Sequence, residues 1–272
     1  MEIFRIGTRG SLLARTQTEW VADRIRNLNP NLKVEIIIIR TTGDANQTSP
    51  FAQVGTKGMF VKELEEALLA CEIDCAVHSL KDMPSDLPDG LMLAAIPDRE
   101  DPRDAYLSNS GPLMELKPGS VMGTSSPRRR AQLLNIRPDL RVEELRGNLD
   151  TRIRKLDEGQ YDGILVACAG LERLGLANRI TERLDGVDFT PAPGQGALAL
   201  EVRTNDSASK LIIEPMANSK AVAETTCERS FQQTLAGGCG VPAGCLARVK
   251  PDGFKVFGMI ANDDGSNVRR EY

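Results

Sequence analysis

The chain has 272 residues, of which 41% are hydrophobic and 26% are charged, and its formal net charge is −4. This length is enough for two domains with room for a small third. The acidic balance excludes a general attraction to nucleic acid or to an anionic membrane. No apolar run approaches the roughly 20 residues of a membrane span, and the first residues lack the apolar core of a signal peptide. We therefore expect a cytoplasmic globular protein with no nucleic-acid or membrane partner.

The first strand–turn–helix unit covers residues 3–28. Residues 3–6 read as a strand, residues 7–11 as a glycine-bearing turn, and residues 12–28 have the apolar spacing of a helix. Backbone amides at the start of such a helix form an anion seat, to which Arg9 and Ser11 could add donors. A plain turn with Ser11 as the helix N-cap explains the same residues equally well.

A nearly all-apolar strand over residues 34–39 follows, as in a sheet that is covered on both faces. Residues 41–58 have no periodicity, and a loop of that length inside a compact domain favours a lid or another functional loop. Lys57 stands at its end, directly before a predicted helix over residues 59–71. Phe60 lies on the apolar face of that helix, where it would serve the core or contact a ligand.

A short apolar run, Cys75-Ala76-Val77, leads into the polar cluster His78-Ser79-Leu80-Lys81-Asp82, and Pro84 ends the segment. A buried strand that ends in polar residues is typical of a site at the carboxyl edge of an open α/β sheet. Lys81 would keep the neighbouring Asp82 carboxylate ionised or let it share a proton with a bound amine. A solvated loop with an incidental Lys-Asp pair is the alternative, and His78 is best interpreted as a hydrogen-bonded structural residue.

The chain then predicts a strand over residues 91–96 and a polar, proline-bounded crossing over residues 97–103. Beyond it we expect strands over residues 105–108, 120–123, 140–145 and 163–167. Helices are expected from residue 124 and over residues 148–157 and 170–176. A second crossing, over residues 190–196, leads to a strand over residues 197–202. A linker over residues 214–220, a helix over residues 221–235 and a hairpin of residues 246–249 and 254–260 complete the chain.

Two crossings indicate that the chain leaves one lobe, builds a second and returns to the first. We expect an α/β protein of two hinged lobes with mainly parallel sheets and a ligand held between them. The predicted domains are residues 1–97 with 197–214, residues 98–196, and a small α+β domain of residues 215–272.

Arginines gather at loop positions, namely Arg9, Arg128, Arg129, Arg130, Arg146, Arg152 and Arg173. Arg128 and Arg129 fall at a helix start, where a cation opposes the helix dipole at a cost of up to about 1 kcal/mol. An anionic ligand would offset that cost, so the pattern favours a pocket for several carboxylates or phosphates. A solvated basic patch is the alternative.

Cysteine usage predicts no metal centre, because the six cysteines include no Cys-x-x-Cys pair and His78 is the single histidine. Cys239 differs from the other five because it lies among Gly237, Gly238 and Gly240. A thiol on such an exposed, tightly bent loop indicates a nucleophile or an attachment point. A glycine-lined packing turn would also account for it.

Nine stretches, in order along the chain, resemble motifs of the porphobilinogen deaminase (hydroxymethylbilane synthase) family. They are G-T-R-G-S (7–11), K-G-M-F-V-K-E-L (57–64), V-H-S-L-K-D-M-P (77–84), R-E-D-P-R-D-A (99–105), G-T-S-S-P-R-R (123–129), L-R-G-N (145–148), A-G-L-E-R-L-G (169–175), G-Q-G-A (194–197) and G-G-C-G-V-P (237–242). Two departures stand out: Pro127 replaces a frequent leucine, and family members usually continue past Tyr272 with a further strand and helix.

The resemblance implies two lobes similar to type II periplasmic binding proteins and a third, small domain. It implies a monomeric transferase that joins four porphobilinogen molecules into hydroxymethylbilane with release of ammonia, in tetrapyrrole (haem) biosynthesis. The catalytic residue would be Asp82, and a dipyrromethane cofactor would be bound covalently to Cys239 as a thioether. Further cofactor contacts would come from Ser79, Lys81, Thr124, Ser126, Arg128, Arg129 and Arg146. Substrate contacts would come from Arg9, Ser11, Lys57, Phe60, Arg152 and Arg173.

Two other functions fit parts of the pattern. A non-catalytic anion-binding module would share the loop arginines but has no use for Asp82 or an exposed Cys239. A hydrolase built from Cys239 and His78 lacks an evident third residue to orient the histidine.

Overall fold

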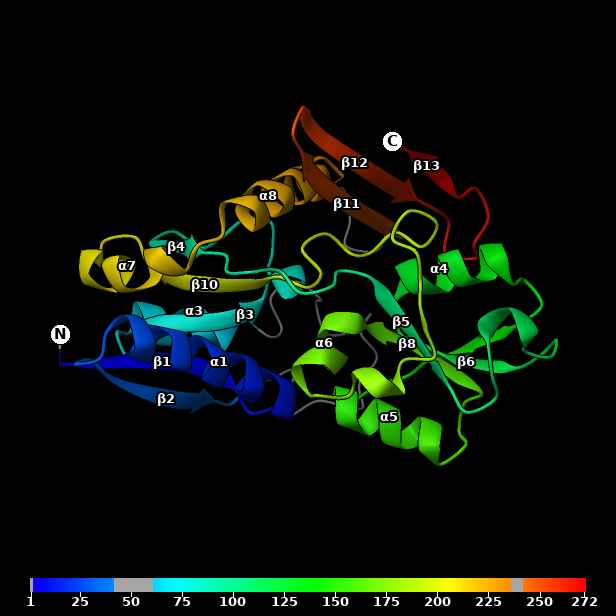
Figure 1. Ribbon diagram of the computed structural model, residues 1–272, viewed down its shortest axis with the longest axis horizontal. Helices are drawn as coiled ribbons and strands as arrows, with labels where there is room; N and C mark the ends of the chain where they lie inside the picture. The colour runs from blue at the N-terminus through cyan, green and yellow to red at the C-terminus, as the bar shows by residue number, and fades with distance from the viewer. Residues whose placement is uncertain (1, 42–60, 236–241) are drawn as a thin grey trace. The chain divides into compact units, whose positions relative to one another are not determined.

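The computed structural model describes residues 2–41, 61–235 and 242–272 of the chain (Figure 1). These residues form two compact units. Unit 1 comprises Met1–Arg99 and Ala197–Ala223, and unit 2 comprises Glu100–Gly196 and Glu224–Tyr272. The chain thus passes between units inside the first expected crossing, directly after the second, and a third time between Ala223 and Glu224. A separate third domain over residues 215–272 stays a prediction.

Unit 1 is built on a five-stranded sheet in the order β2-β1-β3-β10-β4. Its strands are β1 (Ile3–Arg9), β2 (Lys33–Ile39), β3 (Cys75–Ser79), β4 (Leu91–Ala95) and β10 (Leu198–Arg203). β1 is parallel to β2 and β3, whereas β10 is antiparallel to both β3 and β4. Four of its five strands therefore run in one direction, as expected of a mainly parallel sheet. The returning strand β10 makes the sheet mixed, because it inserts between β3 and β4 in the opposite direction.

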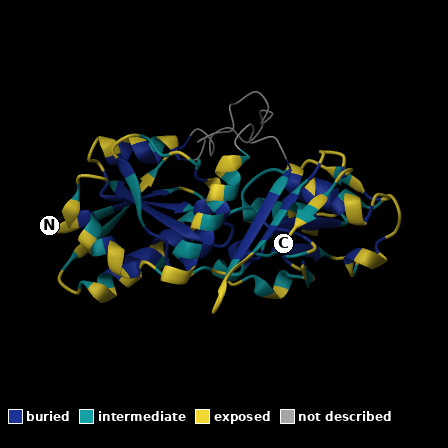
Figure 2. Cartoon of the chain, turned by 90° about the horizontal axis from the view of Figure 1, so that it is seen from above, coloured by how far each residue is buried: buried dark blue, intermediate teal, exposed yellow. Residues whose placement is uncertain are grey.

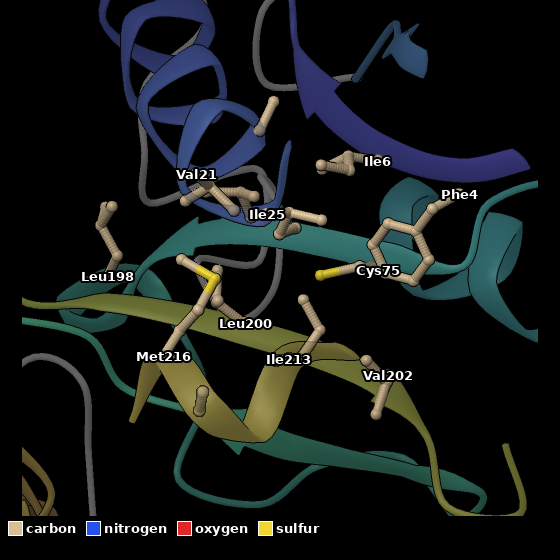
Figure 3. Close-up of a cluster of buried hydrophobic side chains, with 13 residues drawn as sticks. Phe4, Ile6, Val21, Ile25, Cys75, Leu198, Leu200, Val202, Ile213 and Met216 are labelled. Atoms are coloured by element: carbon tan, nitrogen blue, oxygen red, sulfur yellow. The ribbon is translucent and has the colours of Figure 1, made fainter. Parts of the chain in front are cut away.

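The helices of unit 1 are α1 (Leu12–Leu28), α3 (Lys62–Leu69) and α7 (Ser207–Ile213), with short turns η1 (Leu80–Asp82) and η4 (Glu214–Met216). α1 begins where predicted because the Ser11 hydroxyl accepts a hydrogen bond from the Ala14 amide. Its buried face, with Val21 and Ile25, packs over Phe4 and Cys75 of the sheet (Figure 3). This contact fixes α1 beside the strand that leads to Asp82.

β2 begins one residue before its predicted range, but it is less covered by the rest of the unit than the sequence predicts. It was expected in a sheet covered on both faces, yet it lies at the sheet edge and Ile38 is 51% exposed. An apolar β-branched run therefore also suits an edge strand with one half-open side.

Unit 2 contains a second five-stranded sheet in the order β7-β6-β8-β5-β9. Its strands are β5 (Asp104–Ser108), β6 (Val121–Gly123), β7 (Arg141–Glu143), β8 (Gly163–Ala167) and β9 (Glu182–Arg183). β6 is parallel to β7 and β8, and β5 is antiparallel to β8 and β9. This sheet is mixed as well, again because the strand that follows a crossing runs against its neighbours.

The helices α4 (Pro127–Ile136), α5 (Leu149–Asp157) and α6 (Cys168–Arg173) accompany this second sheet, with short turns η2 (Leu113–Glu115) and η3 (Ala177–Arg179). The dark blue, buried segments in Figure 2 include the central strands of the two sheets, whose residues are mostly buried in β3 and β10 and in β5 and β8. Tyr106 and Phe189 are among the largest fully buried side chains and lie in one core cluster of unit 2.

The last part of the chain contains α8 (Ser219–Thr234) and a three-stranded antiparallel sheet of β11 (Ala243–Lys250), β12 (Gly253–Ile260) and β13 (Arg269–Glu271). Met259 and Ala261 pack against Ala131 of α4. The buried Glu228 carboxylate on α8 accepts from the Gly194 amide at 2.7 Å and from the Ala247 amide at 2.9 Å. One side chain thereby joins α8, the second crossing and β11.

Candidate functional site

In unit 1 the predicted site residues lie at one edge of the sheet. β1 and β3 are parallel neighbours, so their carboxyl ends, Arg9 and Ser79, meet at the same edge. Ser11 caps the helix that starts there, and Gln17 of that helix reaches the Ser79 hydroxyl at 3.4 Å. The structure therefore brings Arg9, Ser11 and Ser79 to one edge of the sheet.

Asp82 follows that edge on the single turn η1. The Leu80 side chain is 2% exposed and packs with Val61 and Met83, while its amide donates to the Ala197 carbonyl at 3.0 Å. The Met83 amide closes the turn on the Leu80 carbonyl at 3.1 Å. Asp82 itself is exposed and Lys81 is half-buried. A firmly anchored turn therefore presents a carboxylate beside a cation.

In unit 2 the strands β6, β7 and β8 run parallel, so the loops that follow them share an edge. The Thr124 hydroxyl accepts from the Ser126 amide at 3.2 Å, and Ser126 caps α4. The Ser125 hydroxyl donates to the Leu145 carbonyl at 2.7 Å, which ties the loop after β6 to the loop after β7. Thr124 and Ser126 are thus fixed beside Arg146.

The loop after β7 is shaped by Gly147, whose φ is +108°. A side chain at this position would also place its Cβ 2.7 Å from Thr151 Cγ2. The Gly147 carbonyl accepts from Arg152 Nε at 2.7 Å, and Arg146 pairs with Glu144. Glycine therefore allows the bend through which the loop carrying Arg146 accepts a hydrogen bond from Arg152 of α5 (Leu149–Asp157).

Arg128 and Arg129 lie at the start of α4, as predicted, but their side chains are largely buried around Asp104. Arg128 donates to both Asp104 carboxylate oxygens, at 2.6 and 3.2 Å, and to the Thr190 carbonyl at 2.7 Å. Arg129 donates to Asp104 through Nε at 2.9 Å and Nη2 at 2.7 Å, and to the Leu165 carbonyl at 3.2 Å.

Burial alone would raise the pKa of the Asp104 carboxyl, but the two guanidinium groups hold that pKa far below its usual range. Burial also lowers the pKa of Arg128, against the opposing effect of Asp104. Arginine guanidinium groups are not deprotonated in proteins, so both side chains carry a positive charge. The cluster therefore holds two positive charges and one negative charge inside unit 2.

Arg173 is tied to the second crossing. Its Nη2 donates to the Gly196 carbonyl at 2.7 Å, and burial lowers the pKa of its guanidinium to about 10. Gly196 has a φ of +88°, and a Cβ there would lie 2.5 Å from the Glu100 carbonyl oxygen. The two crossing segments therefore approach each other so closely at this point that only glycine fits.

His78 is buried and its Nε2 lies 3.0 Å from Oε2 of Glu201, which is buried as well. This agrees with its interpretation as a structural residue. Three other predicted site residues, Lys57, Phe60 and Cys239, lie outside the described residues.

Sequence reasoning missed three buried polar residues around the predicted site, namely Asp104, Gln195 and Glu201. Asp104 and Gln195 both stand within stretches that carry the family resemblance, but nothing in their spacing pairs them with an arginine. Their partners lie at least 24 residues away in the chain, as for Asp104 and Arg128. Periodicity and local motifs carry no signal for such contacts.

Among the described ranges, no helix combines the length and the apolar character needed to cross a bilayer. In the same part of the chain, no group of His, Cys, Asp and Glu side chains is arranged to hold a metal ion.

The architecture defines the class of protein. Two α/β units, each built on a mixed five-stranded sheet, form a fold of the type II periplasmic-binding-protein kind. A solved methionine-binding protein, MetQ, superimposes with a TM-score of 0.50 at 14% identity, covering 84% of this chain and 95% of that one.

The sequence comparisons narrow the class to one family. A model described as "Porphobilinogen deaminase, dipyromethane cofactor binding domain" matches residues 4–210, and "Porphobilinogen deaminase, C-terminal domain" matches residues 222–272. The porphobilinogen deaminase of Syntrophobacter fumaroxidans is 46% identical over 98% of this chain and 87% of its own length. The porphobilinogen deaminase of Thermus thermophilus is 46% identical over 99% of this chain and 89% of its own length. The chain belongs to the porphobilinogen deaminase family, and the predicted family and fold class are confirmed.

Proposed function

We propose that this chain is a hydroxymethylbilane synthase, which condenses four porphobilinogen molecules head to tail with release of ammonia, in tetrapyrrole biosynthesis. The observation that carries the proposal is the match of both family models, which together cover residues 4–210 and 222–272. Within that match, Asp82 stands on an anchored and exposed turn. The proposal includes a monomer that works in the cytoplasm.

Asp82 is the proposed catalytic residue. Its carboxylate can accept hydrogen bonds from pyrrole N–H groups and can stabilise the positive charge that develops as the aminomethyl nitrogen leaves. Lys81, one residue earlier, provides a cation that can hold an acidic side chain of the cofactor. The Leu80–Ala197 hydrogen bond of 3.0 Å keeps the turn in place while these charges change.

The residues present fit an anionic, covalently held dipyrromethane. Arg128, Arg129 and Asp104 leave one buried positive charge without a counter-charge among them, and such a charge calls for an anion. A dipyrromethane supplies the primer that is elongated, and its acidic side chains suit this cluster. Cys239 would hold it as a thioether, and the remaining cofactor contacts would come from Ser79, Lys81, Thr124, Ser126 and Arg146.

The substrate contacts are proposed for Arg9, Ser11, Lys57, Phe60, Arg152 and Arg173. Porphobilinogen carries an acetate and a propionate, so the growing chain is a polyanion. Several separate cations suit such a ligand better than a single strong site.

Intact-mass spectrometry of the purified protein tests the proposal. We expect a mass above that of the sequence by one two-pyrrole adduct, lost in Cys239→Ser and kept in Cys71→Ser, which removes a thiol that is exposed in the structure. Asp82→Asn should keep the adduct and lose turnover of porphobilinogen, whereas Asp89→Asn, another exposed aspartate nearby, should keep both. An unmodified wild-type protein that does not consume porphobilinogen would instead indicate an anion-binding module.

A further inference from the structure

Asp104 is a fully buried carboxylate to which none of the predicted functions assigns a role. Its two oxygens accept five hydrogen bonds: two from Arg128, two from Arg129, and one from Gln195 Nε2 at 3.0 Å. The residue is 0% exposed. An ionised carboxylate offers about four lone-pair sites. The side chain is therefore saturated by its three partners and cannot itself contact a ligand.

Asp104 lies at the sheet edge where the cofactor is proposed to bind. It pairs in register with Ala167, the last residue of β8, and β8 is parallel to β6, which ends at Gly123. The carboxylate therefore stands at the same sheet edge as Thr124 and the start of α4. Both arginines that it binds come from the first turn of α4.

The two guanidinium groups are also fixed on their other sides. Arg128 Nη1 donates to the Thr190 carbonyl, Arg129 Nη1 to the Leu165 carbonyl, and Arg129 Nη2 reaches Gln195 Oε1 at 3.4 Å. Gln195 Nε2 in turn donates to the Pro102 carbonyl at 2.7 Å. An arginine side chain usually loses rotamer freedom when it binds a ligand, at a cost in entropy. These hydrogen bonds already fix both side chains, so ligand binding adds little to that cost.

The charge balance points to the ligand class. Two guanidinium groups and one carboxylate leave a net charge of +1, and each arginine side chain is only 7% exposed. The hydrogen bonds above use seven of the ten N–H groups that two guanidiniums carry. One monovalent acid group would balance the charge and accept the remaining donors.

We propose that Asp104 is a positioning residue of the cofactor site: it orients Arg128 and Arg129 as one preorganised seat for a single carboxylate of the dipyrromethane. Gln195 holds Asp104 from the side of the second crossing. This inference rests on the proposed function, since it assumes that these arginines bind the cofactor. It predicts that the orientation of Arg128 and Arg129, rather than the net charge of the cluster, determines how well the cofactor carboxylate is bound.

Charge and geometry give opposite expectations for Asp104→Asn, which keeps the side-chain shape and removes the negative charge. If Asp104 only reduced the charge, the variant cluster would carry +2 and would hold a carboxylate at least as well as the wild type. If Asp104 orients the arginines, the two cations repel each other and separate. Fewer folded molecules then carry the adduct, by about tenfold or more.

Asp139→Asn is the matched control. Asp139 pairs at 2.6 Å with the largely buried Arg137, directly after the other end of α4. Its loss should lower the melting temperature while the folded protein keeps a full adduct. The measurement is the adduct fraction by intact mass in protein shown to be folded by circular dichroism.

Asp104→Glu keeps the charge but displaces the carboxylate by one methylene, and it decides the question if Asp104→Asn does not fold. We expect a folded Asp104→Glu protein with a reduced adduct fraction and a raised KM for porphobilinogen in its loaded molecules. Full loading and an unchanged KM in either folded variant would overturn the positioning role. A wild-type protein without adduct would instead overturn the proposed function itself.

Discussion

Replacing Glu228 with alanine should strongly destabilise unit 2. The Glu228 carboxylate is fully buried and accepts from the Gly194 and Ala247 amides at 2.7 and 2.9 Å. Leaving one buried N–H group without an acceptor costs about 1–3 kcal/mol, so the loss of both should cost about 2–6 kcal/mol. Glu228→Gln keeps one acceptor oxygen and should lose roughly half as much.

Urea unfolding followed by far-ultraviolet circular dichroism measures these differences. Thr226→Ala is the control, because Thr226 is exposed on the same helix, and its effect should stay within about 0.5 kcal/mol. The expected order of stability is Thr226→Ala, then Glu228→Gln, then Glu228→Ala. If Glu228→Ala unfolded within about 1 kcal/mol of the control at an unchanged m-value, the two amide contacts would not anchor α8.

Two further predictions concern the cores of the units. Glu65 is buried, its Oε1 has no hydrogen-bond partner among the described residues, and burial together with Glu201 raises the pKa of its carboxyl. The folded state therefore holds this proton more tightly than the unfolded state. This contribution to stability is full below the ordinary Glu pKa of about 4.3 and is lost as pH rises through the raised value. Glu65→Gln should accordingly gain stability relative to the wild type at pH 8 and lose that advantage at pH 4 in urea titrations; a pH-independent difference would contradict the assignment. Gly163→Ala would place a Cβ 2.5 Å from Tyr106 Cε2 and 2.9 Å from Met122 Sδ, both in the core, and overpacking of this kind costs about 1–3 kcal/mol. Gly10→Ala is the control, because its added Cβ would lie 3.8 Å from the nearest side chain, that of Ile38. Equal melting temperatures for the two variants would contradict the prediction, because the core would then accommodate the methyl group at Gly163 without loss of stability.

The elements that the sequence predicts well are those with a local signal. The helix over residues 12–28 was predicted at its observed bounds because Ser11 caps it and its apolar face repeats regularly. The strand over residues 163–167 also matches, as a short apolar run after a turn. α7 was missed, since a seven-residue helix offers less than two full turns of periodicity.

In the candidate site, too, the features set by neighbouring residues were predicted and the contacts between distant residues were not. The positions of Asp82, after a buried strand, and of Arg128 and Arg129, at a helix start, follow from neighbouring residues in the chain. The contacts of the side chains do not follow in this way: Arg128 donates to Asp104, the first residue of β5, and to the carbonyl of Thr190 in the second crossing. Contacts between distant segments depend on the completed sheet, and a single sequence contains no pattern for them.

The insertion of β10 between β3 and β4 also constrains the order of assembly. β3 and β4 have no direct pairing in the described sheet and are joined only through β10, about a hundred residues further along the chain. During synthesis on the ribosome, the first sheet therefore stays divided, with two open strand edges, until the intervening unit has been made. The residues of the first β-sheet in unit 2, by contrast, form one continuous stretch and need no later strand to close it.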